Sequence, residues 1–347
     1  MASEPSKKET MKAWQYINAS AGLEQSLKLV QTAKPFPQLL SKSELLIRVL
    51  SMSLNPVDYK IPELGLVSKL VVSMPAAPGF DFCGQVVATH TANDRFTMGQ
   101  TVFGRLDKIM KNGTLSEFVV ASQNAVVTLP AEVKVDDAAA VGTAALTAYQ
   151  SIVPFVKGLE SPAIFINGGS GGVGTWAVQI ARILGAEVSV SCSGSSEDLV
   201  RGLGAEHVLD YTKVDIIEGL KHVGPVFDLF VDNVGVPTNL YKESEHFLKP
   251  TGRYVQVAVA ASFASGAQIM DKMLRPTWMG GGNRAYSIVS VKSKQDDLVQ
   301  LARWLEEGKI KAVIDEVFEF EDAPKAVQKL KTGHVKGKLV LHVSRDS

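Results

Sequence analysis

The 347-residue chain has little of several features that would mark a specialised class of protein. It has only two cysteines, Cys83 and Cys192, which excludes a disulfide-rich scaffold and favours a cytoplasmic location. No apolar run reaches the roughly 18 residues that a membrane-spanning helix needs. Lys+Arg and Asp+Glu number 36 each, and this balance argues against a general nucleic-acid or membrane-surface binder.

The first residues also lack an apolar segment. Residues 1–12, MASEPSKKETMK, predict a disordered tail and neither a signal peptide nor a transit peptide. The chain as a whole is 46% hydrophobic and 21% charged, which is typical of a globular protein. Its length exceeds that of one ordinary core, so two domains are expected.

The pattern of apolar residues changes near residue 130. Before it, short β-rich runs separated by Gly, Pro and Asn predict a compact, mostly antiparallel domain, with strands at 45–55, 84–90, 100–104 and 116–121. After a helical pattern at 136–153, strands alternate with helices, which is typical of a parallel α/β sheet. The expected strands are 162–167, 187–193, 227–235 and 252–259, and the expected helices are 175–184 and 197–203. A strand, a helix and a strand follow at 317–320, 321–333 and 337–343.

A glycine-rich stretch, INGGSGGVG at 166–174, lies between the first strand and the first helix of the second half. Gly169, Gly171 and Gly174 fit G-x-G-x-x-G, a fairly specific dinucleotide signal in this context. Such glycines form a tight turn, admit a pyrophosphate to the backbone and let helix and strand pack closely. The helix N-terminus then attracts the anion. The alternative is a connecting loop without a ligand.

The end of the next strand indicates which dinucleotide is bound. NAD sites usually carry an acidic residue there for the ribose 2′-hydroxyl, whereas this chain reads SCSGSS at 191–196, with Ser193 at the expected position. Small hydroxyl residues leave room for a 2′-phosphate, which favours NADPH. No Arg or Lys lies inside the turn, and a solvated loop that caps the next helix is the alternative.

Several stretches spread over nearly the whole chain carry a resemblance to a known family: SLNPVDYKI (53–61), PGFDFCGQVV (78–87), VGTAALTAY (141–149), INGGSGGVGTWAVQIAR (166–182), LGAEHVLDY (203–211), VDNVG (231–235), LVQLARWLEEGKIKAVID (298–315) and GHVKGKLVL (333–341). They resemble the medium-chain dehydrogenase/reductase superfamily. Within it they are similar to the zinc-independent, quinone-oxidoreductase-like branch, in which fungal oxidoreductases carry zinc-type names. The resemblance implies an α/β fold with a GroES-like, mostly-β catalytic domain at 13–136 and 287–347. A Rossmann domain with a doubly wound parallel sheet, 137–286, would be inserted between these parts.

Zinc-bearing members of this superfamily use two cysteines and a histidine as catalytic ligands. The matching positions here are Asn55, Phe80 and Thr143, none of which supplies a thiolate, imidazole or carboxylate. The four-cysteine structural lobe is missing, because the chain has only two cysteines. We therefore predict that the protein has no metal site and no catalytic zinc.

Without a Lewis acid, hydride transfer from NADPH to quinones or α,β-unsaturated carbonyls is the expected reaction. The resemblance places Asn55 near the nicotinamide, where its amide could donate to the substrate oxygen; otherwise it is a turn residue. Tyr59 and Lys60 are candidate proton donors, or else a surface pair at the edge of the cleft. Two further functions stay open: a trans-acting enoyl reductase of a biosynthetic pathway, and a non-catalytic NADPH-binding or sensing protein.

The resemblance also implies the residues that would contact NADPH. Besides Asn55 and the glycine motif, they are Thr143, Ser170, Gly172, Val173, Ser193, Ser196, Tyr211, Asn233, Val257 and Lys336. Relatives often carry a lysine in place of Ser196. For Lys336, a solvated loop lysine is the alternative.

Residues 260–287 contain methionines, a tryptophan and three consecutive glycines. They predict either an apolar substrate lid or a helix at a dimer interface. The expected partner is a small quinone or enone, with a homodimer as a further possibility and with neither nucleic acid nor a membrane.

Overall fold

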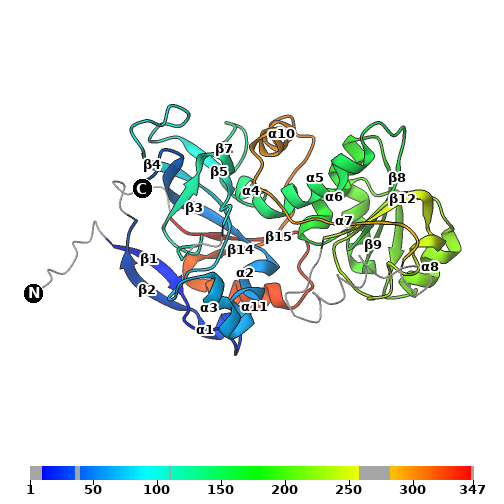
Figure 1. Ribbon diagram of the computed structural model, residues 1–347, viewed down its shortest axis with the longest axis horizontal. Coiled ribbons are helices and arrows are strands. Elements are labelled where there is room, and N and C mark those ends of the chain that lie inside the picture. Colours follow the sequence, from blue (N-terminus) through cyan, green and yellow to red (C-terminus); the bar gives the residue numbers. More distant parts are fainter. Residues whose placement is uncertain (1–9, 36–39, 109–110, 258–281, 345–347) are drawn as a thin grey trace, which may run out of the picture. The chain divides into compact units, whose positions relative to one another are not determined.

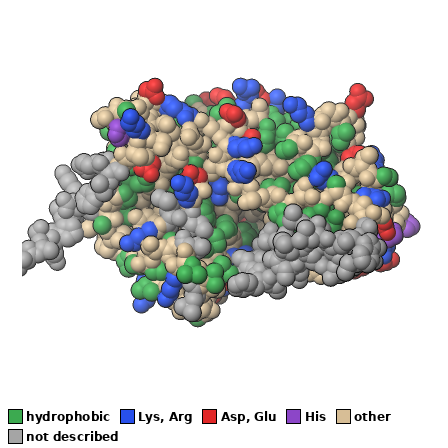
Figure 2. Space-filling view, viewed as in Figure 1, with side chains coloured by type: hydrophobic (Ala, Val, Ile, Leu, Met, Phe, Trp, Pro, Cys, Tyr) green, Lys and Arg blue, Asp and Glu red, His purple; other side chains and the backbone are tan. Residues whose placement is uncertain are grey.

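The computed structural model describes residues 10–35, 40–108, 111–257 and 282–344 (Figure 1). The chain divides into two compact units. Unit 1 comprises Met1–Leu146 and Lys292–Ser347, and unit 2 comprises Thr147–Val291. Among the described residues, no helix combines the length and apolar character needed to cross a membrane. On the face shown in Figure 2, both signs of charge occur among apolar side chains, consistent with the balanced composition.

Unit 1 is built on a seven-stranded sheet with the order β14-β15-β3-β4-β5-β7, in which β6 also pairs with β3. Every pairing is antiparallel except that of β14 with β15. The strands are β3 (Glu44–Leu54), β4 (Asp81–Thr89), β5 (Thr101–Arg105), β6 (Phe118–Ser122), β7 (Val126–Thr128), β14 (Ile314–Glu319) and β15 (Lys338–His342). β3 is buried over most of its length and pairs with three neighbours, which makes it the centre of the unit.

Helices and short turns complete unit 1. They are α1 (Leu23–Ser26), α2 (Pro56–Lys60), η2 (Pro62–Val67), α3 (Ser68–Val71), η3 (Gln123–Ala125), α4 (Val135–Ala139), α10 (Gln295–Glu306), η7 (Phe320–Asp322) and α11 (Ala323–Lys331). The amphipathic helix α11 packs its buried face, including Ala326 and Val327, into the same apolar core as β3 and β4. The α2 helix begins directly after β3, and this places the 53–61 motif at the end of the central strand.

Two expectations for the first part of the chain need correction. Residues 10–12, expected in the tail, instead open β1 (Thr10–Gln15), which pairs antiparallel with β2 (Lys28–Ala33). Met11 is fully buried, and this apolar contact explains why the residues are ordered. The helix expected at 136–153 is divided into α4 and α5 (Gly142–Val156).

Unit 2 holds a six-stranded parallel sheet with the order β10-β9-β8-β11-β12-β13. Its elements are β8 (Ala163–Asn167), α6 (Gly172–Ile183), β9 (Glu187–Cys192), η4 (Gly194–Ser196), α7 (Glu197–Leu203), β10 (His207–Asp210), α8 (Ile216–Val223), β11 (Phe227–Asp232), η5 (Ser244–His246), β12 (Leu248–Gln256) and β13 (Ala285–Ile288). β13 ends at Ile288, so this sheet extends beyond residue 286, the expected end of the Rossmann domain.

The strand order of unit 2 is that of a dinucleotide-binding sheet, in which the direction of winding reverses between the first and fourth strands. Here these strands are β8 and β11, which lie side by side. Apolar and aromatic side chains, among them Phe165, Phe230 and Tyr254, pack with α8 into one core. In such sheets ligands bind outside the carboxyl ends of the strands at the reversal point. The expected lid or interface at 260–287 lies largely outside the described residues, since the structure describes only 282–287 of it.

Candidate active site

A buried polar cluster in unit 1 surrounds Asn55, directly after β3. The Asn55 side-chain oxygen accepts a hydrogen bond from Lys338 Nζ at 2.6 Å, and its Nδ2 donates to Asp81 Oδ2 at 2.7 Å. Lys338 Nζ also donates to the Leu54 carbonyl at 2.8 Å and lies 3.6 Å from Asp81 Oδ2. These contacts fix which end of the Asn55 amide faces which neighbour, because oxygen must face the ammonium.

Asp81, the first residue of β4, is the anion at the centre of this cluster. Its Oδ1 accepts from both the backbone N–H and the hydroxyl of Thr143, at 2.7 and 2.6 Å. Thr143 Oγ1 in turn accepts from Arg105 Nε at 3.1 Å. Burial lowers the pKa of Lys338, and the charge of Asp81 opposes that shift. The cluster therefore pairs each buried charge with an opposite one, as burial of charge requires.

Asp58, in α2 just after the end of β3, is a second buried carboxyl. Its Oδ2 accepts from the Asn55 backbone N–H at 2.6 Å, whereas its Oδ1 has no partner among the described residues. Burial, reinforced by the charge of Asp81, raises the pKa of Asp58 to about 7. A pocket of about 20 Å³, space for roughly one water, is lined by Asp58, Val57, Phe80 and neighbouring apolar residues.

Tyr59 and Lys60, the candidate proton donors, and Lys336, an expected cofactor contact, lie outside this cluster. The Tyr59 ring packs against the core and has Lys331 Nζ 5.8 Å from its centre; burial raises its pKa. No hydrogen bond described in the structure joins Tyr59 or Lys60 to the cluster. Lys336 is half-buried, but the lysine of the GHVKGK run that enters the cluster is Lys338. A charged residue inside the apolar run of the strand expected at 337–343 was the signal for Lys338. Asp81 precedes the strand expected at 84–90, so that pattern did not mark it.

The glycine loop of unit 2 connects β8 to α6. Gly168 has φ 80°, which favours glycine, and its N–H donates to Ser191 Oγ at 2.9 Å. A Cβ on Gly174 would lie 2.1 Å from the Gly168 carbonyl oxygen, so only glycine permits this approach of helix and loop. The first helical hydrogen bond runs from Thr175 N to Gly171 O. The N–H groups of 172–174 thus have no acceptor within the helix and can receive an anion.

The polar residues after β9 and β11 lie at the same edge of the sheet. Ser193 Oγ lies 3.1 Å from Ser195 Oγ and 3.4 Å from Ser196 Oγ, and Tyr211 follows β10 with a half-exposed side chain. Asn233 follows β11, and neither its side-chain oxygen nor its nitrogen, both buried, has a partner among the described residues. Val257 follows β12 and donates its N–H to the Asp232 carbonyl at 2.8 Å.

Comparison with known proteins identifies the group to which this chain belongs. Residues 41–131 match the family described as "Alcohol dehydrogenase GroES-like domain", and residues 203–341 match "Zinc-binding dehydrogenase". The trans-enoyl reductase pgmF of Aspergillus terreus is 45% identical over 347 residues and covers 96% of both chains. The chain belongs to the medium-chain dehydrogenase/reductase superfamily.

Other members of the superfamily are similar over most of their length. The quinone oxidoreductase from Coxiella burnetii superposes with a TM-score of 0.83 at 29% identity, over 96% of this chain and 100% of that one. A zinc-type alcohol dehydrogenase-like protein of Schizosaccharomyces pombe is 33% identical, over 88% of this chain and 89% of the relative. The predicted superfamily and fold class are confirmed. The protein is an oxidoreductase of this superfamily, and its Rossmann-like unit implies binding of a nicotinamide cofactor.

The superfamily includes zinc enzymes, but the residues of this chain do not fit a catalytic zinc. Asn55 turns its oxygen to the Lys338 ammonium, and the Thr143 hydroxyl is bonded to Asp81. Phe80 offers no donor atom. An amide, a hydroxyl and a phenyl ring next to a buried ammonium are not a zinc ligand set.

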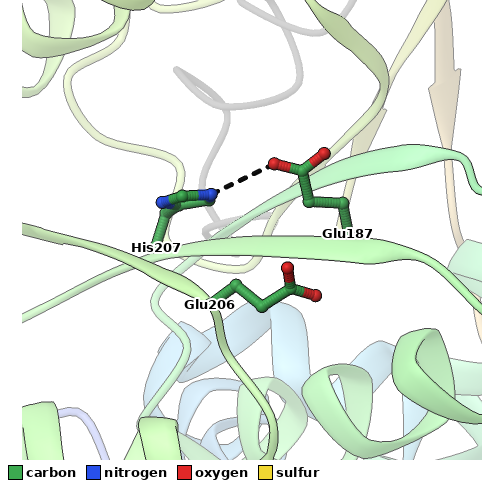
Figure 3. A group of neighbouring side chains, drawn as sticks. All are labelled: Glu187, Glu206 and His207. Atoms are coloured by element: carbon green, nitrogen blue, oxygen red, sulfur yellow. Dashed lines mark hydrogen bonds and ion pairs between the residues drawn. The ribbon is translucent and has the colours of Figure 1, made fainter.

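Among the described residues, one group of three His, Cys, Asp or Glu side chains brings its ligand atoms within 4.8 Å of one another: Glu187, Glu206 and His207 (Figure 3). All three are exposed, and His207 Nε2 lies 3.1 Å from Glu187 Oε1. Glu187 and His207 begin β9 and β10, so the group lies at the edge of the sheet opposite to the glycine loop. It is a surface ion pair with a third carboxylate beside it, and it has no part in the candidate site.

Proposed function

We propose that the protein is an NADPH-dependent, zinc-independent enoyl reductase that acts in trans on an unsaturated acyl chain carried by a biosynthetic synthase. The observation that carries the proposal is the 45% identity to a trans-enoyl reductase over 96% of both chains. This activity was an alternative in the sequence analysis, behind a general quinone or enone reductase, and the relative moves it to first place.

The bound cofactor would supply a hydride to an electron-poor double bond. A C=C bond conjugated to a thioester carbonyl is a suitable acceptor, because the carbonyl oxygen takes up the incoming charge. The Asn55 amide has two N–H groups, of which one is bonded to Asp81. The second has no acceptor among the described residues and can donate to the substrate carbonyl, and Lys338 prevents the amide from turning its oxygen there instead.

A proton must reach the carbon next to the carbonyl after hydride transfer. Tyr59 and Lys60 remain the proposed donors. The Tyr59 phenol carries its proton at neutral pH, although burial raises its pKa and so makes it a weaker acid. For the cofactor, we propose backbone contacts from Gly169 to Gly174 and side-chain contacts from Thr143, Ser193, Ser196, Tyr211, Asn233 and Lys336, with Val257 near the nicotinamide.

The test is NADPH oxidation by the purified protein with crotonyl thioesters, free enones and quinones, each with and without a chelator. Turnover of the thioester that is indifferent to the chelator is expected. Asn55→Ala should lower kcat about a hundredfold, since one preorganised donor is lost. The exposed Asn18→Ala is the matched control and should leave kcat unchanged. Thioester turnover unaffected by Asn55→Ala would remove Asn55 from the proposal.

A general quinone or enone reductase is the second candidate, favoured by the similarity to the Coxiella burnetii quinone oxidoreductase. Fast reduction of quinones without reduction of thioesters would establish it in place of the enoyl reductase. NADPH binding without turnover of any acceptor would instead indicate a sensing protein. The cytoplasmic location and the homodimer stay predictions.

A further inference from the structure

The serine turn after β9 lies against the end of β10. Asp210 is paired in register with Cys192, and Tyr211 N donates to the Cys192 carbonyl at 3.2 Å. A Cβ on Gly194 would lie only 2.6 Å from Asp210 Oδ2. The absence of a side chain at Gly194 therefore lets the serine turn and the Asp210 carboxylate come together.

Asp210 brings a cation to the same place. Lys213 Nζ lies 3.4 Å from Asp210 Oδ2, and the Lys213 side chain is 74% exposed. Both the Lys213 ammonium and the position of a Cβ on Gly194 lie close to Asp210 Oδ2, at 3.4 and 2.6 Å. The distance between the two therefore cannot exceed the sum of these values. That is close enough for one phosphate to contact both Lys213 and a serine hydroxyl. An ammonium has three donors, so it can keep its contact with Asp210 and bind a second anion.

We propose that Lys213 is the residue that selects NADPH over NADH, by binding the 2′-phosphate together with the hydroxyls of Ser193 and Ser196. The assignment rests on the proposed cofactor site. Lys213 lies in the turn after the neighbouring strand β10 and supplies the cation that the serine turn itself lacks. Arg201, on the helix α7 that follows the serine turn, is engaged elsewhere, by Glu197 at 2.9 Å and by the Glu206 carbonyl at 2.9 Å.

The Asp210 carboxylate would repel a phosphate if it stood alone. Its Oδ1 accepts from Thr212 N at 3.0 Å and from Thr212 Oγ1 at 2.6 Å, and these bonds lower its pKa. The carboxylate is thus held within its own turn, and its Oδ2, which has no hydrogen bond among the described residues, lies 3.4 Å from the Lys213 ammonium. The competing possibility is that Asp210 accepts from a ribose 2′-hydroxyl, which would reverse the preference toward NADH.

Binding of two adenosine fragments separates these possibilities. The full-length protein is titrated by calorimetry with 2′,5′-ADP, which carries the 2′-phosphate, and with 5′-AMP, which does not. The wild-type protein should bind 2′,5′-ADP more tightly. K213Q should weaken binding of 2′,5′-ADP about fivefold or more and leave 5′-AMP unchanged, since a charge-assisted contact is lost. K213R should restore much of the affinity, and the effect should shrink as salt rises.

Lys221 provides a matched control. It lies in the last turn of α8, which leads to the amino-terminal end of β11, and it pairs with Glu218 and Glu243. K221Q makes the same charge change and should leave both affinities unchanged. Equal 2′,5′-ADP affinity of wild type and K213Q would overturn the role of Lys213 alone. Preference of the wild type for 5′-AMP would overturn it in favour of Asp210. Failure of the wild type to bind either fragment would overturn the cofactor site of the proposed function as well.

Discussion

The polar residues of the candidate site are held differently around Asn55 in unit 1 and around Asn233 in unit 2. In unit 1, Asn55, Asp81, Thr143 and Lys338 are bonded to one another, and Lys338 and Asp81 have side chains that are 2% and 0% exposed. In unit 2, the polar groups at the carboxyl ends of the strands include a side chain, Asn233, whose buried amide atoms have no partner among the described residues.

This difference indicates two roles, one in holding a fixed geometry and one in binding a ligand. Mutually bonded buried groups hold one geometry, because each is costly to expose without its partner. Unpartnered groups beside a glycine loop are typical of a surface that is completed by a ligand. Changes in the cluster around Asn55 should therefore lower the stability of the free protein, whereas changes at Asn233 and in the glycine loop should lower the affinity for cofactor.

The largest effect is expected from Lys338→Met. The substitution keeps a long apolar side chain but leaves Asp81 and the Asn55 oxygen without their buried cation. Loss of one partner of a buried ion pair costs about 3–5 kcal/mol of unfolding free energy. Chemical denaturation of the cofactor-free protein measures this loss.

Lys325 provides the control for that experiment, since it lies in the same unit and pairs with Asp322 while 74% exposed. Lys325→Met should change the unfolding free energy little, because exposed ion pairs contribute little. Equal stabilities of the Lys338 and Lys325 variants would show that the cluster does not hold unit 1 together.

Asp58→Asn should change how stability depends on pH. The pKa of Asp58 rises from its ordinary 3.8 to about 7 in the folded protein, chiefly through burial, with Asp81 nearby; Lys338 and Arg105 oppose the shift. The folded state therefore holds a proton that the unfolded state releases between these values. The contribution of Asp58 to stability is present below its unfolded pKa and is lost as pH rises through about 7.

The variant lacks this contribution, because an amide does not titrate. The stability of Asp58→Asn relative to wild type should rise by a few kcal/mol between pH 4 and pH 8 and then level off. Denaturation at several pH values gives the difference, with the exposed Asp94→Asn as control. A difference that does not change with pH would show that Asp58 is ionised throughout.

The sequence predicted the parts of the molecule that depend on local pattern. The strands of the central sheets and the glycine loop follow from apolar runs and from turn chemistry. The short strands β1, β2, β10 and β13 were not predicted; in β2, β10 and β13 few side chains are buried, so their apolar signal is weak. Such strands are stabilised further by pairing with a neighbouring strand, and this pairing cannot be seen in the sequence.

Long-range contacts explain what was missed in the candidate site. Asn55 was selected by its motif, but its partner Lys338 lies 283 positions away. The same closing run contains Lys336, which the resemblance assigns to the cofactor, and a one-dimensional match does not show that Lys338 is the buried lysine of the run. In the same way, Lys213 lies outside the serine turn in sequence and beside it in space.

Gly174→Ala should weaken cofactor binding without a similar effect on unit 1. The new Cβ would lie 2.1 Å from the Gly168 carbonyl oxygen, so the loop must shift. Overpacking of this kind costs about 1–3 kcal/mol, which corresponds to a loss of NADPH affinity of roughly five- to 150-fold. Gly202→Ala, in α7, meets nothing within 4 Å and is the control; it should bind NADPH as wild type does. Equal affinities would show that the loop does not contact the cofactor.

The smallest effect, and the sharpest test of the comparison, is expected from Asn233→Ala. Because both amide atoms are buried without a partner, their removal should leave the cofactor-free protein as stable as wild type or slightly more so. NADPH affinity should fall roughly fivefold, as expected when one hydrogen-bonded group is lost. Asn167→Ala should instead lower the stability of the cofactor-free protein and leave the NADPH affinity unchanged. The Asn167 amide is already bonded to Asp232 and Ser191, at 2.9 and 2.6 Å. A loss of cofactor-free stability in the Asn233 variant would mean that its amide supports the fold, as the bonded side chains around Asn55 do.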